Sequence, residues 1–246
     1  MRRAMPVERR IEIDGVNCLC GRQAGQAYWL VLTGIGPKAA DAAARAVLNR
    51  CRAALVVSTG FAGALLPAAA VGDVIVATTV VGAKFDEVWT QVGPAITCDS
   101  SVRQVVHAAA AEMNLTVHSG PVLSVPTIVC RAVDKLQVSR LTGTIAIDME
   151  SAAIAEVASA QGVPFGVVRT VSDVVDEDLP LDFNAFLKPW GWMRGIGAVL
   201  LSPGSLVALN RLRLQSRLAA KRLTALIAGW AANGFGLSSG SQVGKA

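Results

Sequence analysis

The chain has 246 residues, of which 52% are hydrophobic, enough to bury the core of one globular domain. Its net charge of +5 is unevenly spread. From residue 186 onward there are eight Lys and Arg side chains and no acid, which leaves 15 bases against 18 acids, a net −3, in residues 1–185. The main part of the chain therefore lacks the basic surface that nucleic-acid binding requires.

Cysteine and histidine usage argues against a metal site. The five cysteines form no C-x-x-C pair, and only His107 and His118 could add imidazole ligands. Free thiols and a charged N-terminus without an apolar signal core predict a cytoplasmic protein. Residues 53–72 carry no charge, but Ser58, Gly60 and Pro67 interrupt the run, so we expect a buried strand and loop there instead of a membrane span.

Strands and helices alternate along the chain, which is typical of an α/β fold. The expected order is a hairpin at 11–20, a strand at 28–33, a helix at 37–51, strands at 54–58 and 73–81, a helix at 100–113, a strand at 116–125, a helix at 133–141, a strand at 144–147, a helix at 151–161 and a strand at 165–171.

The sequence predicts three parts: one domain over residues 1–188, a basic amphipathic helical extension over 189–233 and a Gly/Ser-rich disordered tail over 234–246. The extension holds a helix at 206–230, with bases at near-helical spacing among leucines and with tryptophans near its ends. Much of an apolar face can be formed by Leu206, Leu209, Leu212, Leu223, Leu226 and Ile227. Such a segment can rest at a bilayer interface, or it can pack on the core and expose a solvated basic face. Both interpretations stay open at this point.

Carboxylates follow two of the apolar strands. Asp148 and Glu150 follow the strand at 144–147, and Asp173 follows the strand at 165–171. Two other strands lead into glycine turns, Gly34-Ile35-Gly36 and residues 59–63. If these four strands run parallel, the acids and the glycines converge on one cleft beyond the strand ends. The plainer alternative is that Asp148 caps the next helix and Asp173 caps a turn.

Two carboxylates on one rim suit glycosidic cleavage, in which one acid protonates the leaving group and another group stabilises a cationic sugar. A dinucleotide fold is the competing interpretation, because residues 34–39 match G-x-G-x-x-A. That pattern expects an acid at the end of the second strand, and this chain has Val57-Ser58-Thr59 there.

At this point the motifs resemble the purine nucleoside phosphorylase and nucleosidase superfamily. Within it they are most similar to methylthioadenosine/S-adenosylhomocysteine nucleosidases and to hopanoid-associated adenosylhopane nucleosidases. The resemblance rests on ordered segments, namely Gly34-Ile35-Gly36, residues 59–63, Val71-Gly72-Asp73-Val74, residues 148–155, Val163-Pro164-Phe165 and residues 169–173. It implies a single-domain, three-layer fold with a mixed central sheet.

The resemblance also implies roles for particular residues. Asp173 would protonate N7 of the purine, and Glu150 would hold the ribose hydroxyls, with Met149 against the sugar. Ile128 and Val129 would pack the base and read its edge through the backbone. Gly60, Phe61 and Ser172 lie in the matching motifs and are expected to line the substrate site.

Two departures from the family pattern matter. Phe61 stands where the family places a serine, and a phenyl ring offers phosphate no donor, so water is the expected acceptor. The N-terminus is short, with Arg2 and Arg3 in place of an apolar strand, so Glu8 is the candidate for the family's water-activating Glu. Glu8 as an exposed surface acid is the alternative.

We therefore expect an adenine nucleosidase of the methylthioadenosine, S-adenosylhomocysteine or adenosylhopane type, acting without metal or cofactor. The family it resembles is usually dimeric, and the basic tail adds possible peripheral contact with the inner face of the membrane. The alternatives are a phosphorylase that consumes inorganic phosphate, and an inactive paralogue that binds nucleosides or membranes.

Overall fold

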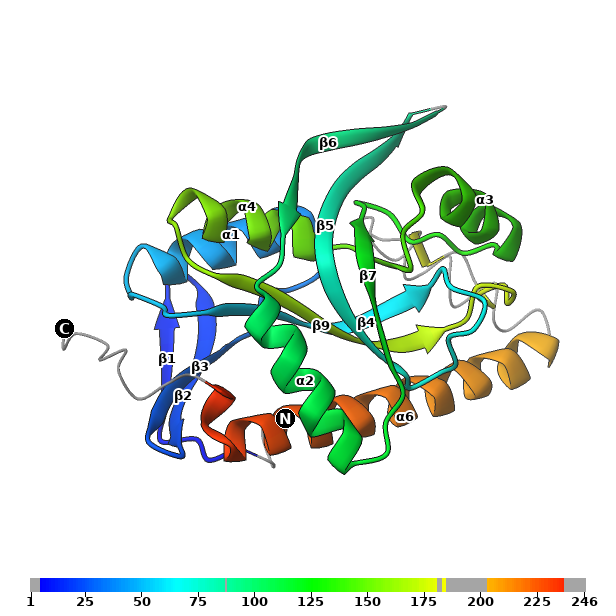
Figure 1. Cartoon of the computed structure of the whole chain (residues 1–246). Helices are drawn as coiled ribbons and strands as arrows, with labels where there is room; N and C mark the ends of the chain where they lie inside the picture. Colours follow the sequence, from blue (N-terminus) through cyan, green and yellow to red (C-terminus); the bar gives the residue numbers. More distant parts are fainter. Residues whose placement is uncertain (1–4, 87, 181–182, 185–202, 237–246) are drawn as a thin grey trace.

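The computed structural model describes residues 5–86, 88–180, 183–184 and 203–236. Its strands form two sheets (Figure 1). The smaller sheet is antiparallel and consists of β1 (Arg9–Ile13), β2 (Val16–Gln23) and β3 (Gln26–Val31). The larger sheet has the order β6-β5-β7-β8-β4-β9, with β4 (Val56–Ala64), β5 (Val74–Asp86), β6 (Val88–Thr97), β7 (Val117–Ser124), β8 (Ala146–Asp148) and β9 (Phe165–Asp173).

Strand directions in the larger sheet are mixed, as expected. β4 runs parallel to β9, and β7 runs parallel to β5 and β8, whereas β8 is antiparallel to β4. A further antiparallel pairing of β5 with β9 joins the two halves of the sheet into a ring. The expectation that strands 28–33, 54–58, 144–147 and 165–171 run parallel in one sheet is wrong, because β3 belongs to the smaller sheet and β8 opposes β4.

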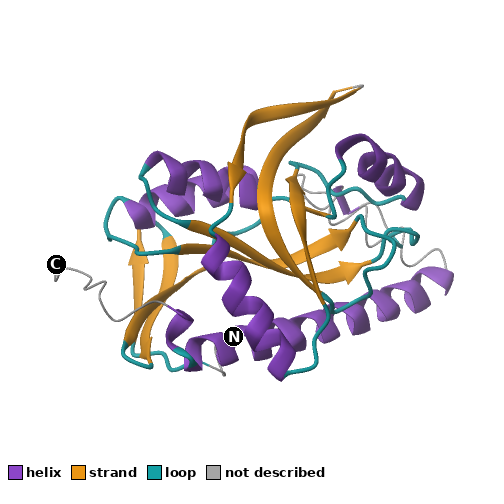
Figure 2. Ribbon diagram, in the orientation of Figure 1, coloured by secondary structure: helices purple, strands orange, loops and turns teal. Residues whose placement is uncertain are grey.

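Helices cover the larger sheet on both faces (Figure 2), which confirms the three-layer α/β fold. α1 (Pro37–Leu48) and α4 (Ser151–Ala160) share one apolar core with Ile75 and Ala77 of β5. The alternate residues Val74 and Val76 share the opposite core with α2 (Ser100–Glu112) and α6 (Pro203–Ala232). α3 (Ala132–Thr142) lies beside the ends of β4 and β7 (Figure 1). Successive side chains of a strand point to opposite faces, so one strand supplies both cores.

The C-terminal helix α6 is a packed part of the fold over its second half. Leu223, Leu226, Ile227 and Trp230 are buried, and Thr170 of β9 donates a hydrogen bond to the Ala219 carbonyl at 3.2 Å. Leu223, Leu226 and Ile227 belong to the apolar face that could rest on a membrane or pack on the core, and the core covers them. In the first half of α6, Val207, Leu214 and Leu218 are exposed.

Residues 234–236, expected to begin a disordered tail, form a 3₁₀ turn in which the Phe235 ring packs edge-on against Tyr28 and Trp230. The rest of that expectation, residues 237–246, lies outside the described residues, as do Trp190 and Trp192 of the extension. The uncharged run 53–72 forms β4 and the loop after it. In the described part of the chain, no helix is long and apolar enough to cross a bilayer.

Candidate functional site

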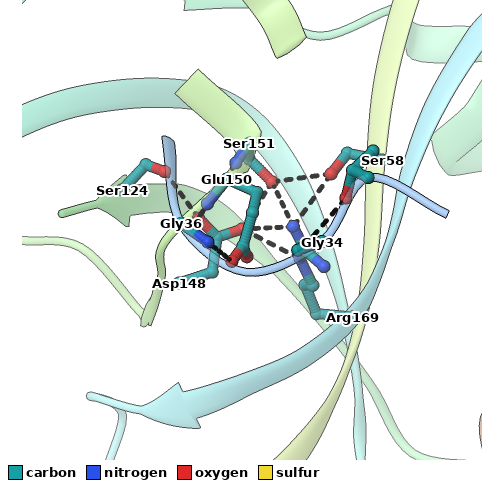
Figure 3. A network of polar contacts seen from close by, with 9 residues as sticks. Gly34, Gly36, Ser58, Ser124, Asp148, Glu150, Ser151 and Arg169 are labelled. Carbon is teal, nitrogen blue, oxygen red and sulfur yellow. Dashed lines mark hydrogen bonds and ion pairs between the residues drawn. The ribbon is translucent and has the colours of Figure 1, made fainter. Parts of the chain in front are cut away.

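Asp148 forms the centre of a buried polar network (Figure 3). Its Oδ1 accepts hydrogen bonds from Ser124 Oγ at 2.7 Å and from the backbone N–H groups of Glu150 and Ser151 at 3.3 and 3.2 Å. Its Oδ2 accepts from Arg169 Nε at 2.8 Å and from the Ser151 hydroxyl. Asp148 therefore fixes the start of α4, as the helix-capping interpretation predicted, and its acceptor capacity is used inside the protein.

Arg169 completes this network, and the sequence interpretation missed it. Its Nη2 donates to the hydroxyls of Ser58 and Ser151, both at 2.8 Å. A Cβ on Gly60 would lie 2.3 Å from Arg169 Nη1, so Gly60 leaves room for the guanidinium. An arginine inside the apolar strand 165–171 was the available signal, because a buried charge requires a partner.

Residues 59–63, expected to form a turn, continue β4 as a strand to Ala64. The glycines there accommodate side chains from neighbouring strands, Arg169 at Gly60 and Asp173 at Gly63. Gly60 was expected to contact the substrate, and the contact that the structure shows is with Arg169. The local sequence resembled a turn, and the tertiary packing explains its glycines.

Glu150 follows Asp148 at the start of α4 and reaches across to α1. Its Oε1 accepts a hydrogen bond from the Gly36 N–H at 2.8 Å (Figure 3). Gly36 precedes α1 with φ of 88°, a left-handed conformation that favours glycine. A helix N-terminus stabilises a carboxylate, so Glu150 is held in place through one oxygen while its second oxygen can face a ligand. Met149 lies beside it, with Cε 4.0 Å from the position of a Cβ on Gly36.

Asp173 ends β9 and is almost fully buried. Its Oδ2 accepts a hydrogen bond from Lys135 Nζ at 2.6 Å, and its Oδ1 accepts one from Ser172 Oγ at 2.8 Å. A Cβ on Gly63 would lie 3.0 Å from Asp173 Oδ2 and 3.3 Å from Ile147 Cγ2. The end of β9 and the segment that carries Asp148 and Glu150 thus flank the same residue of β4.

A hollow of about 360 Å³ opens beside Asp173, a volume in the range of small-molecule sites. It lies between the segment after β9 and the first half of α6. Its lining consists of Asp173, Glu177, Asp178, Leu179, Pro180, Val207, Arg211, Leu212 and Gln215. Arg211 and Gln215 bind the Glu177 carboxylate at 2.6 and 3.0 Å and thereby hold that segment to α6.

The backbone of Ile128 is paired with a side chain of the same protein. Asn184 Oδ1 accepts from the Ile128 N–H at 2.7 Å, and Asn184 Nδ2 donates to the Ile128 carbonyl at 2.8 Å. The carboxamide therefore meets both polar groups of the edge that was expected to read a base. Val129 packs next to it against the apolar cluster that includes Leu65 and Ile147.

Phe61 and Glu8 are both exposed. Phe61 lies on β4 with 43% of its surface exposed. Glu8 is exposed and precedes β1, where its backbone N–H donates to the Cys20 carbonyl at 2.9 Å. Cys20 pairs with Trp29, two positions before Val31, the last residue of β3 ahead of the glycine turn. The role of Glu8 as the water-activating Glu stays a prediction.

Four of the five thiols are poor candidates for nucleophiles. Burial raises the pKa of Cys18, Cys20 and Cys51, and it raises the pKa of Cys98 to about 12. A thiol is nucleophilic as the thiolate, and these groups stay protonated near neutral pH. The carboxylates of the site are therefore the better candidates for catalytic groups.

Comparison with known proteins agrees with the fold. A family model described as the phosphorylase superfamily matches residues 4–189. The fold is similar to that of the 5′-methylthioadenosine/S-adenosylhomocysteine nucleosidase from Neisseria meningitidis in complex with methylthio-immucillin-A, with a TM-score of 0.74, 21% identity and coverage of 94% of this chain and 92% of that chain.

Two further solved structures share the fold at lower similarity. S-adenosylhomocysteine nucleosidase from Streptococcus pyogenes, in complex with 5-methylthiotubericidin, matches with a TM-score of 0.67, 19% identity and coverage of 89% and 86%. A futalosine hydrolase mutant of Helicobacter pylori strain 26695 matches with a TM-score of 0.64, 19% identity and coverage of 89% and 88%. At these identities the likeness establishes the shared fold.

Proposed function

The chain belongs to the phosphorylase superfamily, and from this premise we propose that it is a nucleosidase that hydrolyses the N-glycosidic bond of an adenine nucleoside. The observation that carries the proposal is the pair of acids on either side of β4. Asp173 is almost buried beside a hollow, and Glu150 is held at the N-terminus of α1.

In the proposed reaction, Asp173 acts on the base. Its O–H bond breaks as an N7–H bond forms, and the electron pair of the C1′–N9 bond moves onto the purine, which leaves as neutral adenine. A water oxygen then bonds to C1′ and a proton is released. A positioned acid of this kind contributes roughly 10² to 10⁴ to the rate. Ser172 supports the role, because its hydroxyl orients Asp173 Oδ1.

Glu150 acts on the sugar in this proposal. The Gly36 N–H holds one carboxylate oxygen, so the other can accept hydrogen bonds from the ribose hydroxyls. These bonds strengthen as the ring becomes cationic in the transition state, and they therefore favour cleavage over ground-state binding. Met149, beside Gly36, packs against the sugar. Ile128 and Val129 bind the base, and the polar edge of the base displaces the Asn184 carboxamide from the Ile128 backbone.

Water is the proposed acceptor because the exposed ring of Phe61 provides no hydrogen-bond donor for phosphate. Incubation of the pure protein with methylthioadenosine, with and without phosphate, tests this directly. Release of free adenine at the same rate in both conditions supports hydrolysis. Formation of a ribose 1-phosphate product would instead favour a phosphorylase, and an absence of any product would favour an inactive nucleoside-binding paralogue.

The 5′ substituent of the substrate is proposed to be methylthio, homocysteinyl or a hopanoid lipid. The hopanoid alternative is favoured by the first half of α6, where exposed Val207 lines the hollow beside Asp173 and Leu214 and Leu218 are also exposed. Arg213 and Arg217 on the same half carry positive charge that attracts anionic lipid. Comparing turnover of methylthioadenosine with that of an adenosine carrying a large apolar 5′ group tests the choice.

We further propose that the protein is a cytoplasmic homodimer and that it contacts the membrane peripherally. Contact with a membrane would use Val207, Leu214 and Leu218, since the apolar residues of the second half of α6 are buried. Co-sedimentation with anionic vesicles, compared between the wild-type protein and a variant with serine at these three positions, tests the contact. Sedimentation velocity tests the dimer.

A further inference from the structure

Lys135 on α3 is the most completely buried charged side chain of the described residues, with 0% of its surface exposed. Its ammonium group donates to Asp173 Oδ2 at 2.6 Å, to the Val174 carbonyl at 2.9 Å and to the Glu177 carbonyl at 3.1 Å. An ammonium group has three protons, and here each has an acceptor. The site is built to hold a charged lysine.

One of these contacts, together with a contact from Ser172, fixes the position of Asp173. The ammonium holds Oδ2 while the Ser172 hydroxyl holds Oδ1, so the carboxyl plane is set from both sides. The two carbonyl contacts bind the segment that follows β9 to the same ammonium. Through its Nζ atom, Lys135 therefore connects α3 to the end of β9 and to Glu177, which lines the hollow.

Packing alone does not explain a lysine at this position. Removing an ammonium group from water is costly, and an apolar side chain of similar length commonly gives equal or greater stability. The adjacent buried position on the same helix face, Val138, is apolar. Here the buried cation contacts a candidate acid that borders a hollow, an arrangement that is typical of a functional site.

We propose that Lys135 is a positioning residue that stabilises the carboxylate that Asp173 becomes as it protonates the purine, an inference that rests on the proposed function. When the Asp173 O–H bond breaks and the N7–H bond forms, negative charge develops 2.6 Å from the ammonium. Lys135 keeps its three protons throughout. A fixed charge aimed at a developing charge lowers the barrier without reorganisation.

The experiment compares Lys135→Met with a control on the same helix, Arg140→Met, whose side chain is exposed. Lys135→Met is expected to lower kcat by about 10- to 100-fold with little change in KM, because charge-assisted hydrogen bonds are of that strength. Arg140→Met is expected to retain wild-type kcat. Unchanged kcat in Lys135→Met, or a change confined to KM, would overturn the proposal.

A double-mutant cycle separates positioning from general structural support. If Lys135 acts through Asp173, then adding Lys135→Met to Asp173→Asn lowers the residual activity by less than about twofold. If Lys135→Met lowers activity by the same factor in the wild-type protein and in Asp173→Asn, then Lys135 has a structural role only. Lys135→Gln, which keeps a hydrogen-bond donor without the charge, serves where Lys135→Met does not fold, and it is expected to show the same loss of kcat.

Failure of the proposed function has a different outcome. If the wild-type protein releases no adenine, both the proposed function and the proposed role of Lys135 are wrong. If the wild-type protein is active and the Lys135 variants have the same kcat, only the proposed role of Lys135 is wrong.

Discussion

Asp148 and Asp173 look alike in the sequence and differ in the structure. Each follows an apolar strand, is nearly excluded from solvent and pairs with a buried cation, Arg169 or Lys135. Asp148 receives five hydrogen bonds from donors in the core, whereas the described residues give Asp173 two, and it borders a hollow. A buried ion pair by itself therefore does not distinguish a functional acid from a structural one. Unused acceptor capacity and access distinguish the candidate acid from the structural one.

The largest expected effect is on stability at Asp148. Asp148→Asn leaves Arg169 buried without a counter-charge and is expected to lower the free energy of unfolding by about 3–5 kcal/mol. The exposed Asp41–Arg45 pair is the control, since Asp41→Asn is expected to cost less than about 0.5 kcal/mol. Urea unfolding measures both variants. A small loss for Asp148→Asn would mean that the network is not a structural centre.

At Asp173 the expected effect is on catalysis. Asp173→Asn is expected to lower the rate of adenine release by at least about a hundredfold, the lower end of general acid catalysis. Asp173→Asn also removes the counter-charge of buried Lys135, so some loss of stability is expected. The fold should persist, because the ammonium keeps the asparagine oxygen and the Val174 and Glu177 carbonyls as acceptors. Steady-state kinetics and circular dichroism provide the comparison. Near-normal turnover would remove Asp173 from the mechanism and erase the contrast with Asp148.

Glu150 sharpens the comparison because it shares a segment with Asp148 but faces α1. Glu150→Gln keeps an acceptor for the Gly36 N–H while it loses the charge that stabilises a cationic sugar. It is expected to reduce kcat by roughly tenfold and to change KM less, the signature of an interaction made chiefly in the transition state. A variant altered only in KM contradicts this role.

The smallest effect is expected at Asn184. Asn184→Ala frees the Ile128 backbone edge, so adenine no longer competes with the carboxamide and is expected to bind about 5- to 10-fold more tightly. Isothermal titration with adenine measures this, and Asn17→Ala, at an exposed position, is the control. Weaker binding by Asn184→Ala would show that Asn184 instead holds Ile128 in its binding conformation.

Most strand and helix positions followed from the sequence, because hydrophobic periodicity and glycine turns are local signals. The sequence did not predict β6 (Val88–Thr97), and it predicted a turn at residues 59–63, which continue β4. The helix expected at 100–113 is α2, Ser100–Glu112, and the strand expected at 116–125 is β7, Val117–Ser124. Strand direction did not follow, since no local signal records which strands pair. β8, with three residues, was placed in the wrong direction for that reason.

The candidate site divides in the same way. The sequence alone determined the α/β class, the family resemblance and the acids at 148, 150 and 173, because strand-end carboxylates and ordered motifs are readable in one dimension. Only the tertiary structure decided that β8 runs antiparallel to β4, that Asp148 pairs with Arg169 and that Lys135 contacts Asp173. These facts depend on contacts between residues 21 to 38 positions apart or on pairing between strands. Such contacts are set by how the whole chain packs, and the local sequence around the residues that make them does not indicate them.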